Sequence, residues 1–124
     1  MRVKIKSISD SGNIKKERIV MKVLSNTNIG NYSLFESETI SDGVTTSLLD
    51  VFWFPDKKVE AGDLVVLYTK SGNQNEKQIK NGNTAHFFYW ESNNAKWKGS
   101  ESAPVLLEIA DWQAYFEHTH NKAN

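Results

Sequence analysis

The sequence contains no cysteine, and only two of its 124 residues are proline. Without cysteine the chain forms neither a disulfide framework nor a thiolate metal site, and a cysteine nucleophile is excluded. The 15 basic and 15 acidic residues give a formal net charge of zero, so no overall field directs the chain onto a nucleic acid or an anionic membrane. Binding of such a polyanion would therefore need a local patch of charge.

A long apolar run is also missing. The first ten residues, MRVKIKSISD, alternate charged and apolar side chains instead of forming the continuous apolar core of a signal peptide. No later stretch approaches the length of a membrane span. These absences lead us to expect a cytoplasmic location.

What the sequence does contain is enough apolar material for one core. Hydrophobic residues make up 39% of the chain, and four Trp, four Tyr and six Phe supply large side chains. A chain of this length buries roughly two-thirds of the surface that its unfolded form exposes. We therefore expect a single domain over residues 1–124, with a flexible tail at about 118–124.

Alternating apolar and polar residues predict about seven to eight short strands, because successive side chains of a strand point to opposite faces. In RVKIKSI, for example, Val3 and Ile5 alternate with basic residues, which indicates one buried face. Short strands separated by turn-rich segments are typical of an all-β antiparallel sandwich or barrel. The strands are expected at residues 2–8, 17–24, 31–37, 44–54, 64–70, 86–90 and 105–110.

Several segments mark the joints between these strands. Pro55 cannot donate to a sheet ladder, so a strand should end there, and Gly62 fits the last turn position before the next strand. The polar segment SGNQNEKQIKNGN, residues 71–83, is too long for a tight hairpin, and we expect it to be a mobile loop.

The C-terminal stretch is open between two structures. Its residues alternate as in a strand, which is the preferred interpretation, yet Val105, Ile109 and Trp112 also fall at helical spacing. Residues 105–117 are therefore expected to form either a strand or a short helix.

The order of these features resembles the lamin tail domain, over about residues 3–110. The resemblance is carried by VKIKSI, ERIVMKVLSNTNI, YSLFES, FWFPDKKVEAGDLVVLYTKSG and HFFYWESNNAKWKGS. It implies an immunoglobulin-like antiparallel β-sandwich and a non-enzymatic scaffolding or targeting role, and the family's signature Trp in the loop before the last long strand would be Trp97. Unlike the family pattern, the segment EIADWQAYFEH has no glycine for a final hairpin.

The sequence offers no catalytic motif. It lacks a phosphate-cradling glycine loop, a Gly-x-Ser-x-Gly elbow and a His-Glu-x-x-His helix. His118 and His120 occupy alternate positions and could therefore bind one metal ion, with His86 as a third ligand. The other interpretation is that His118 and His120 belong to a solvated tail. We therefore expect no enzyme activity, no cofactor and no metal site.

Aromatic residues suggest where a ligand could bind. Trp53 and Trp90 are expected in the core, whereas Lys96-Trp97-Lys98 places a ring between two cations, a pattern suited to single-stranded nucleic acid. The preferred interpretation of Trp97, however, is a ring that pins its loop to the core beneath solvated lysines. If consecutive strands alternate in direction, the loops 25–31, 55–62 and 91–104 gather at one end of the sandwich. The resulting candidate binding patch consists of Lys57, Lys58, Lys96, Trp97 and Lys98. The opposite end would carry a second group of cations, interpreted as solvated: Lys15, Lys16, Arg18, Lys77 and Lys80.

The leading functional hypothesis is a β-sandwich interaction or targeting module that contacts a protein partner through end loops or a sheet edge. One alternative is weak binding of nucleic acid or another polyanion through the candidate patch, and a second is carbohydrate binding through exposed aromatics. The charged residues along RVKIK should prevent this first strand from pairing with a strand of another chain, which favours a monomer.

Overall fold

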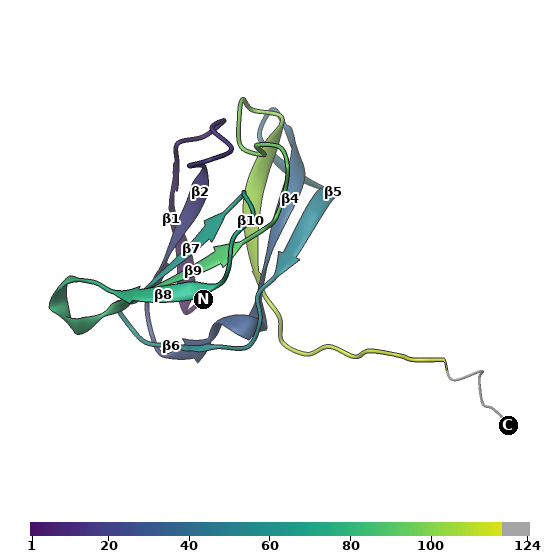
Figure 1. The fold of residues 1–124 in the computed structure, drawn as a ribbon. Coiled ribbons are helices and arrows are strands. Elements are labelled where there is room, and N and C mark those ends of the chain that lie inside the picture. Colours follow the sequence, from purple (N-terminus) through teal and green to yellow (C-terminus); the bar gives the residue numbers. More distant parts are fainter. Residues whose placement is uncertain (118–124) are drawn as a thin grey trace, which may run out of the picture.

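A computed structural model describes residues 1–117, and its strands form two facing sheets (Figure 1). The strands are β1 (Val3–Ser9), β2 (Arg18–Val23), β3 (Thr27–Asn28), β4 (Tyr32–Ile40), β5 (Gly43–Trp53), β6 (Lys58–Val59), β7 (Leu64–Tyr68), β8 (Asn75–Gln78), β9 (Thr84–Tyr89) and β10 (Ser102–Glu108). One sheet has the order β1-β2-β7-β9-β8 and the other the order β10-β4-β5, while β3 and β6 form a small third sheet. The predicted all-β sandwich is confirmed, with ten strands in place of seven or eight.

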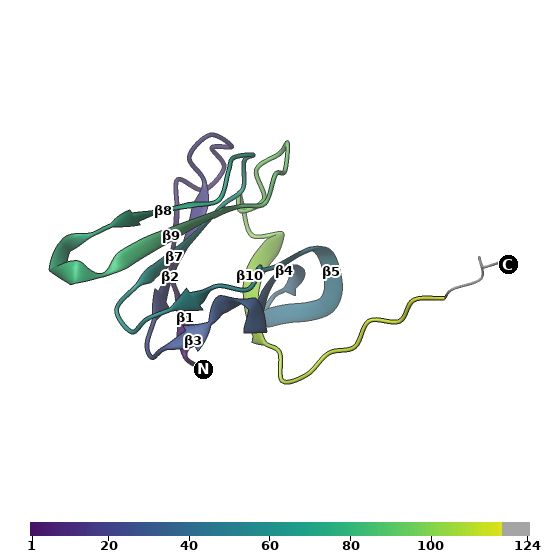
Figure 2. The same cartoon turned by 60° about the horizontal axis from the view of Figure 1, so that its bottom comes forward.

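The core lies between the two large sheets, which separate clearly when the molecule is turned (Figure 2). Alternate positions of each strand point inward, as pleating requires. The five-stranded sheet contributes Ile19, Met21, Val65, Leu67 and Phe88, and the other layer contributes Tyr32, Leu34 and Phe54. The only helical segments of the described chain are the 3-10 turns η1 (Ile29–Asn31) and η2 (Lys80–Gly82). No helix within residues 1–117 has the length and apolar character to cross a membrane.

The segment 71–83 is not simply a loop. Residues Asn75–Gln78 form β8, which pairs antiparallel with β9 at the edge of the five-stranded sheet. Because β8 reverses the chain, β9 runs parallel to β7, with Leu64 opposite Ala85 and Tyr68 opposite Tyr89. The expectation of a structureless segment here is therefore wrong. All four residues of β8 are polar and exposed, so its sequence lacks the alternation of apolar and polar residues that predicts a strand.

The ends of the strands follow the turn residues. β5 ends at Trp53, two residues before Pro55, and Gly62 precedes β7 with a φ of 94°, a conformation that glycine adopts without steric cost. The joint between them contains the two-residue strand β6, which pairs with β3.

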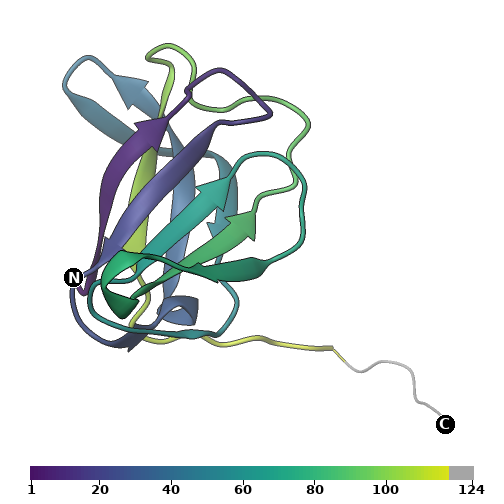
Figure 3. The same cartoon turned by 60° about the vertical axis from the view of Figure 1, so that its left-hand side comes forward.

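The C-terminal stretch is a strand only in its first part. β10 pairs with β4 through Glu108, and the Ile109 N–H donates to the carbonyl of Asn31 (2.7 Å). Residues 109–117 contain neither a helix nor a strand, and they run away from the sandwich in all three views (Figures 1 to 3). The predicted tail at 118–124 lies outside the described residues.

Candidate interaction surface

Glu17 anchors the loop between β9 and β10 to the rest of the sandwich. The residue is fully buried just before β2. Its carboxylate accepts hydrogen bonds from the backbone N–H groups of Gly12, Lys96 and Trp97 and from the hydroxyl of Thr69. Burial opposes its ionisation, but these donors together outweigh burial and lower the pKa of Glu17. The carboxylate is therefore a structural charge.

The Lys96 ammonium is also used internally. Its Nζ lies 2.8 Å from Asp50 Oδ2, 3.2 Å from Glu36 Oε1 and 4.5 Å from the ring centroid of Trp90. The side chain is only 8% exposed. Burial would raise the pKa of Asp50, but hydrogen bonds from Lys96 and the Val51 backbone, among others, lower it. With its charge already balanced by carboxylates, Lys96 has little left to offer a polyanion.

Trp97 belongs to the core. Its side chain is 4% exposed and packs near Trp90, with ring centroids 6.1 Å apart. Of the two interpretations of Trp97, the ring that pins its loop to the core is confirmed and the open ring between two cations is wrong, because Glu17 fixes the backbone of this loop and the indole is buried. Of the Lys-Trp-Lys sequence only Lys98 is exposed.

The predicted patch is also divided between the two ends of the molecule. Residues 55–62 precede β7, whereas residues 91–101 follow β9, and the two strands run parallel. The first loop therefore lies at the lower end in Figure 1 and the second at the upper end. Lys57 forms an ion pair with Glu76 (2.6 Å), and Lys58 is exposed on β6. The structure thus brings Lys57 and Lys58 together, but it separates them from Lys96, Trp97 and Lys98.

His86 and Asp63 form a buried pair at the start of β9. His86 Nε2 lies 2.9 Å from Asp63 Oδ2, and the other carboxylate oxygen accepts N–H groups of Asn83 and Thr84. Burial would raise the pKa of Asp63, but hydrogen bonds from the Glu60 backbone, His86 and these neighbours lower it to about 2. His86 Nδ1 has no hydrogen-bond partner within residues 1–117.

No metal site forms around this pair. In residues 1–117 no group of three or more His, Asp or Glu side chains is placed to hold a metal ion. His118 and His120, considered above as ligands, lie outside the described residues.

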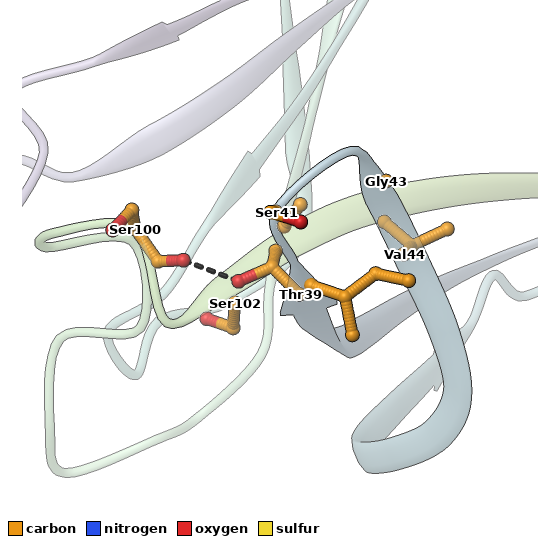
Figure 4. A pocket seen from close by; sticks show the side chains of 8 residues that line it. Thr39, Ser41, Gly43, Val44, Ser100 and Ser102 are labelled. Carbon is orange, nitrogen blue, oxygen red and sulfur yellow. Dashed lines mark hydrogen bonds between the residues drawn. The ribbon is translucent and has the colours of Figure 1, made fainter.

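A depression lies at the upper end, between the tip of the β4–β5 hairpin and the loop before β10 (Figure 4). The Thr39 hydroxyl donates to the carbonyl of Ser100 across it. Its lining consists of Thr39, Ile40, Ser41, Gly43, Val44, Ser100, Ser102 and Ala103. None of these side chains titrates near neutral pH, so the depression offers no general acid or base.

The outward face of the three-stranded sheet is the most distinctive surface of the chain. Twelve large apolar residues of the described chain are exposed, and six of them lie between Ile40 and Trp53; of these six, Leu48, Val51 and Trp53 belong to this face. Two shallow depressions of about 300 Å³ and 190 Å³ mark this face. We call it the apolar face and define it by Phe35, Leu48, Val51, Trp53, Val105, Leu107 and Ile109. Its concentration of exposed apolar side chains is typical of an interaction site.

Trp53 lies on the apolar face, where it is 46% exposed. The expectation that it fills the core is wrong, because Phe52 takes the inward position of β5 and packs against Phe54 at 5.0 Å. The core prediction holds in part for Trp90, which is partly buried against the core. The Trp53 indole donates to the Gly30 carbonyl (2.9 Å), and the ring of Trp112 meets it edge-on at 4.9 Å. An aromatic side chain from an extended segment thus already rests on this face.

β5 adds a free strand edge to the apolar face. The strand has eleven residues and ends the sheet order, so its outer side pairs with no strand of the described chain. Its sequence GVTTSLLDVFW contains no lysine or arginine, and its one acid, Asp50, binds Lys96. Long edge strands without such charges readily accept another strand.

No protein-family model matches the chain, and a search of the curated proteins finds no match.

Proposed function

We propose that this chain is a non-enzymatic interaction module that binds a protein partner through the apolar face and the adjoining edge of β5. The observation that carries the proposal is the gathering of exposed apolar residues on one side of one sheet, with Leu48 at 42%, Val51 at 44% and Trp53 at 46% exposure. Removing such a surface from water contributes about 25 cal/mol per Å² of apolar area. Covering it therefore favours association.

The partner segment is an extended chain with apolar or aromatic residues at alternate positions. Added along β5, such a segment would satisfy the free backbone groups of the edge and turn alternate side chains onto the apolar face. Trp112 provides an example of this chemistry, because it reaches Trp53 from an extended segment of the same chain. The shallow depressions beside Phe35 and Leu107 would take the following side chains.

The resemblance to the lamin tail domain supports the same class of function. That resemblance implies an immunoglobulin-like scaffold that acts by binding partners and not by catalysis. A sheet edge was one of the two contact surfaces expected from the sequence, and β5 offers one without protective cations.

The test is a selection of extended peptides from a random library against the whole chain. Peptides with alternating apolar residues should be enriched and should bind in a fluorescence-anisotropy assay. Leu48→Lys, on the apolar face, should weaken that binding at least about tenfold, because a charge would have to be desolvated. The matched control is Leu24→Lys, which alters a residue of similar exposure (47%) away from this face.

Two results would overturn the proposal. One is a selection without alternating apolar peptides, and the other is equal loss of binding in both lysine variants. Circular dichroism of the two variants would show that each keeps its β-sheet content.

A further inference from the structure

The outward face of the five-stranded sheet, which is turned forward in Figure 3, carries positive charge, although the whole chain has a formal net charge of zero. Core residues such as Met21, Val65 and Phe88 take the inward positions, so their strand neighbours point outward. The pairings then place Lys4, Arg18, Lys22 and Lys77 on the outward face, and no acidic residue occupies a strand position there. A chain with zero net charge therefore presents one basic sheet face.

The basic face continues into a depression at its upper end. This depression, of about 510 Å³, is lined by Asp10, Lys15, Lys16, Arg18, Tyr68 and Lys70. Asp10 is the one acid among them, and it pairs with Arg18 at 2.8 Å. The other acid nearby is Glu91, whose backbone N–H donates to the Lys70 carbonyl (3.2 Å). We define the basic face by Lys4, Lys15, Lys16, Arg18, Lys22, Lys70 and Lys77.

Aromatic rings cross this face, and two of them stack on each other. Tyr68 stacks on Tyr89 with ring centroids 5.5 Å apart and an angle of 11° between the rings. Lys70 and Arg18 lie 4.9 Å and 5.8 Å from the centroid of the Tyr68 ring. A Cβ atom at Gly72 would lie 2.5 Å from the Tyr89 ring, so the chain passes directly beside it. The Tyr68 ring therefore lies beside two cations of this face, Arg18 and Lys70.

We propose that the basic face binds the phosphate backbone of a nucleic acid without reading its bases. The cations follow β2, from the turn at Lys15 and Lys16 through Arg18 to Lys22. Arg18 and Lys22 are four strand residues apart, about 13 Å. A nucleic-acid strand carries a phosphate about every 3.4 Å of duplex axis, so a linear row of cations meets several phosphates of one strand. This site is separate from the apolar face and does not depend on the proposed function.

The test is fluorescence anisotropy of labelled 20-nucleotide single strands and duplexes with the whole chain, over a series of salt concentrations. Contacts to about three to five phosphates predict a log-log salt slope of about −2 to −4, with duplex and single strand distinguishing the two sources of phosphate. The triple variant Lys16→Glu, Lys22→Glu, Lys70→Glu should lower affinity at least about tenfold and flatten the slope.

The matched control carries the same change of charge elsewhere. Lys58→Glu, Lys80→Glu and Lys98→Glu alter three exposed lysines outside the basic face. This variant should keep most of the affinity, because none of its three lysines lies in the row of cations that follows β2. If the first triple variant does not fold, the corresponding Lys→Gln variants replace it, with the same expected order of affinities.

Three outcomes would overturn the inference. The first is no binding of either oligonucleotide at low salt, and the second is an equal loss of affinity in the two triple variants. The third is binding of heparin or of anionic phosphatidylserine vesicles without binding of oligonucleotides, which would assign the basic face to another class of polyanion.

Discussion

The outward faces of the two sheets differ in how far their apolar residues are covered. Val66, on β7 in the middle of the five-stranded sheet, is 5% exposed, whereas Val51, on the edge strand β5, is 44% exposed. β7 has β2 and β9 as neighbours, so that Val66 lies between Val20 and Phe87 on this face. β5 has a strand on one side only. Position within a sheet, and not hydrophobicity alone, thus decides whether an outward valine is covered.

The largest expected effect comes from placing a charge on each of these two valines. Val66→Asp should lower the free energy of unfolding by about 3 kcal/mol or more, because the carboxylate would be buried without a partner. Val51→Asp should change it by about 0.5 kcal/mol or less, since that side chain already meets water. Urea unfolding followed by circular dichroism measures both. Similar costs at the two positions would remove the contrast between the faces.

The covered core between the two sheets also depends on the burial of Trp97. Glu17→Gln should destabilise the chain by about 2–3 kcal/mol, because the buried carboxylate accepts four hydrogen bonds and an amide presents N–H groups to some of those donors. Tryptophan emission should shift to longer wavelength as Trp97 is exposed. Glu60→Gln, at an exposed acid, is the control and should leave both measurements unchanged. An unshifted emission in Glu17→Gln would show that other contacts hold the loop.

The positions of most strands could be predicted from the sequence, but the strand directions could not. Alternation in RVKIKSI and LVVLYTK located strands because apolar residues on one face of a strand are buried. NEKQ has no such alternation, since β8 is held by backbone pairing with β9 and exposes all four residues. Omitting this one strand reversed the inferred direction of β9 and placed residues 91–104 at the wrong end of the sandwich.

Exposure was equally hard to infer. In VFWF, alternation separates Phe52 from Trp53, but it does not say which of the two faces another layer covers. The anchoring by Glu17 had no local signal either, because its donors come from residues 12, 69, 96 and 97. Only the fold brings them together, and this is why the sequence left an open Trp97 ring as an alternative to a buried one.

A smaller effect is expected from acid, acting through Asp63 at the start of β7. Its folded pKa, about 2, lies below the ordinary value of 3.8. The stability that Asp63 contributes is therefore complete above pH 3.8 and is lost as pH falls towards 2, by about 2 kcal/mol.

The measurement is the melting temperature between pH 5 and pH 2, for the unaltered chain and for Asp63→Asn. The Asn variant should be less stable at pH 5 and should lose less stability on acidification. Protonation of Asp63 in acid should loosen the five-stranded sheet and expose more of its apolar side chains. The difference in apolar exposure between the two sheets should then become smaller. Parallel pH curves for the two proteins would show that other carboxylates dominate the acid response.

The smallest effect concerns the partial cover of the apolar face. Trp112→Ala removes a ring that meets Trp53 edge-on, a contact contributing about 0.5–1.5 kcal/mol when buried. Trp112 is 63% exposed, so the melting temperature should fall by only a few degrees at most. Binding of a hydrophobic dye should rise, since Trp53 loses its cover. Tyr115→Ala, at a residue 84% exposed, should change neither measurement. A fall in dye binding would instead show that Trp112 itself binds the dye. The apolar face would then extend onto the C-terminal segment.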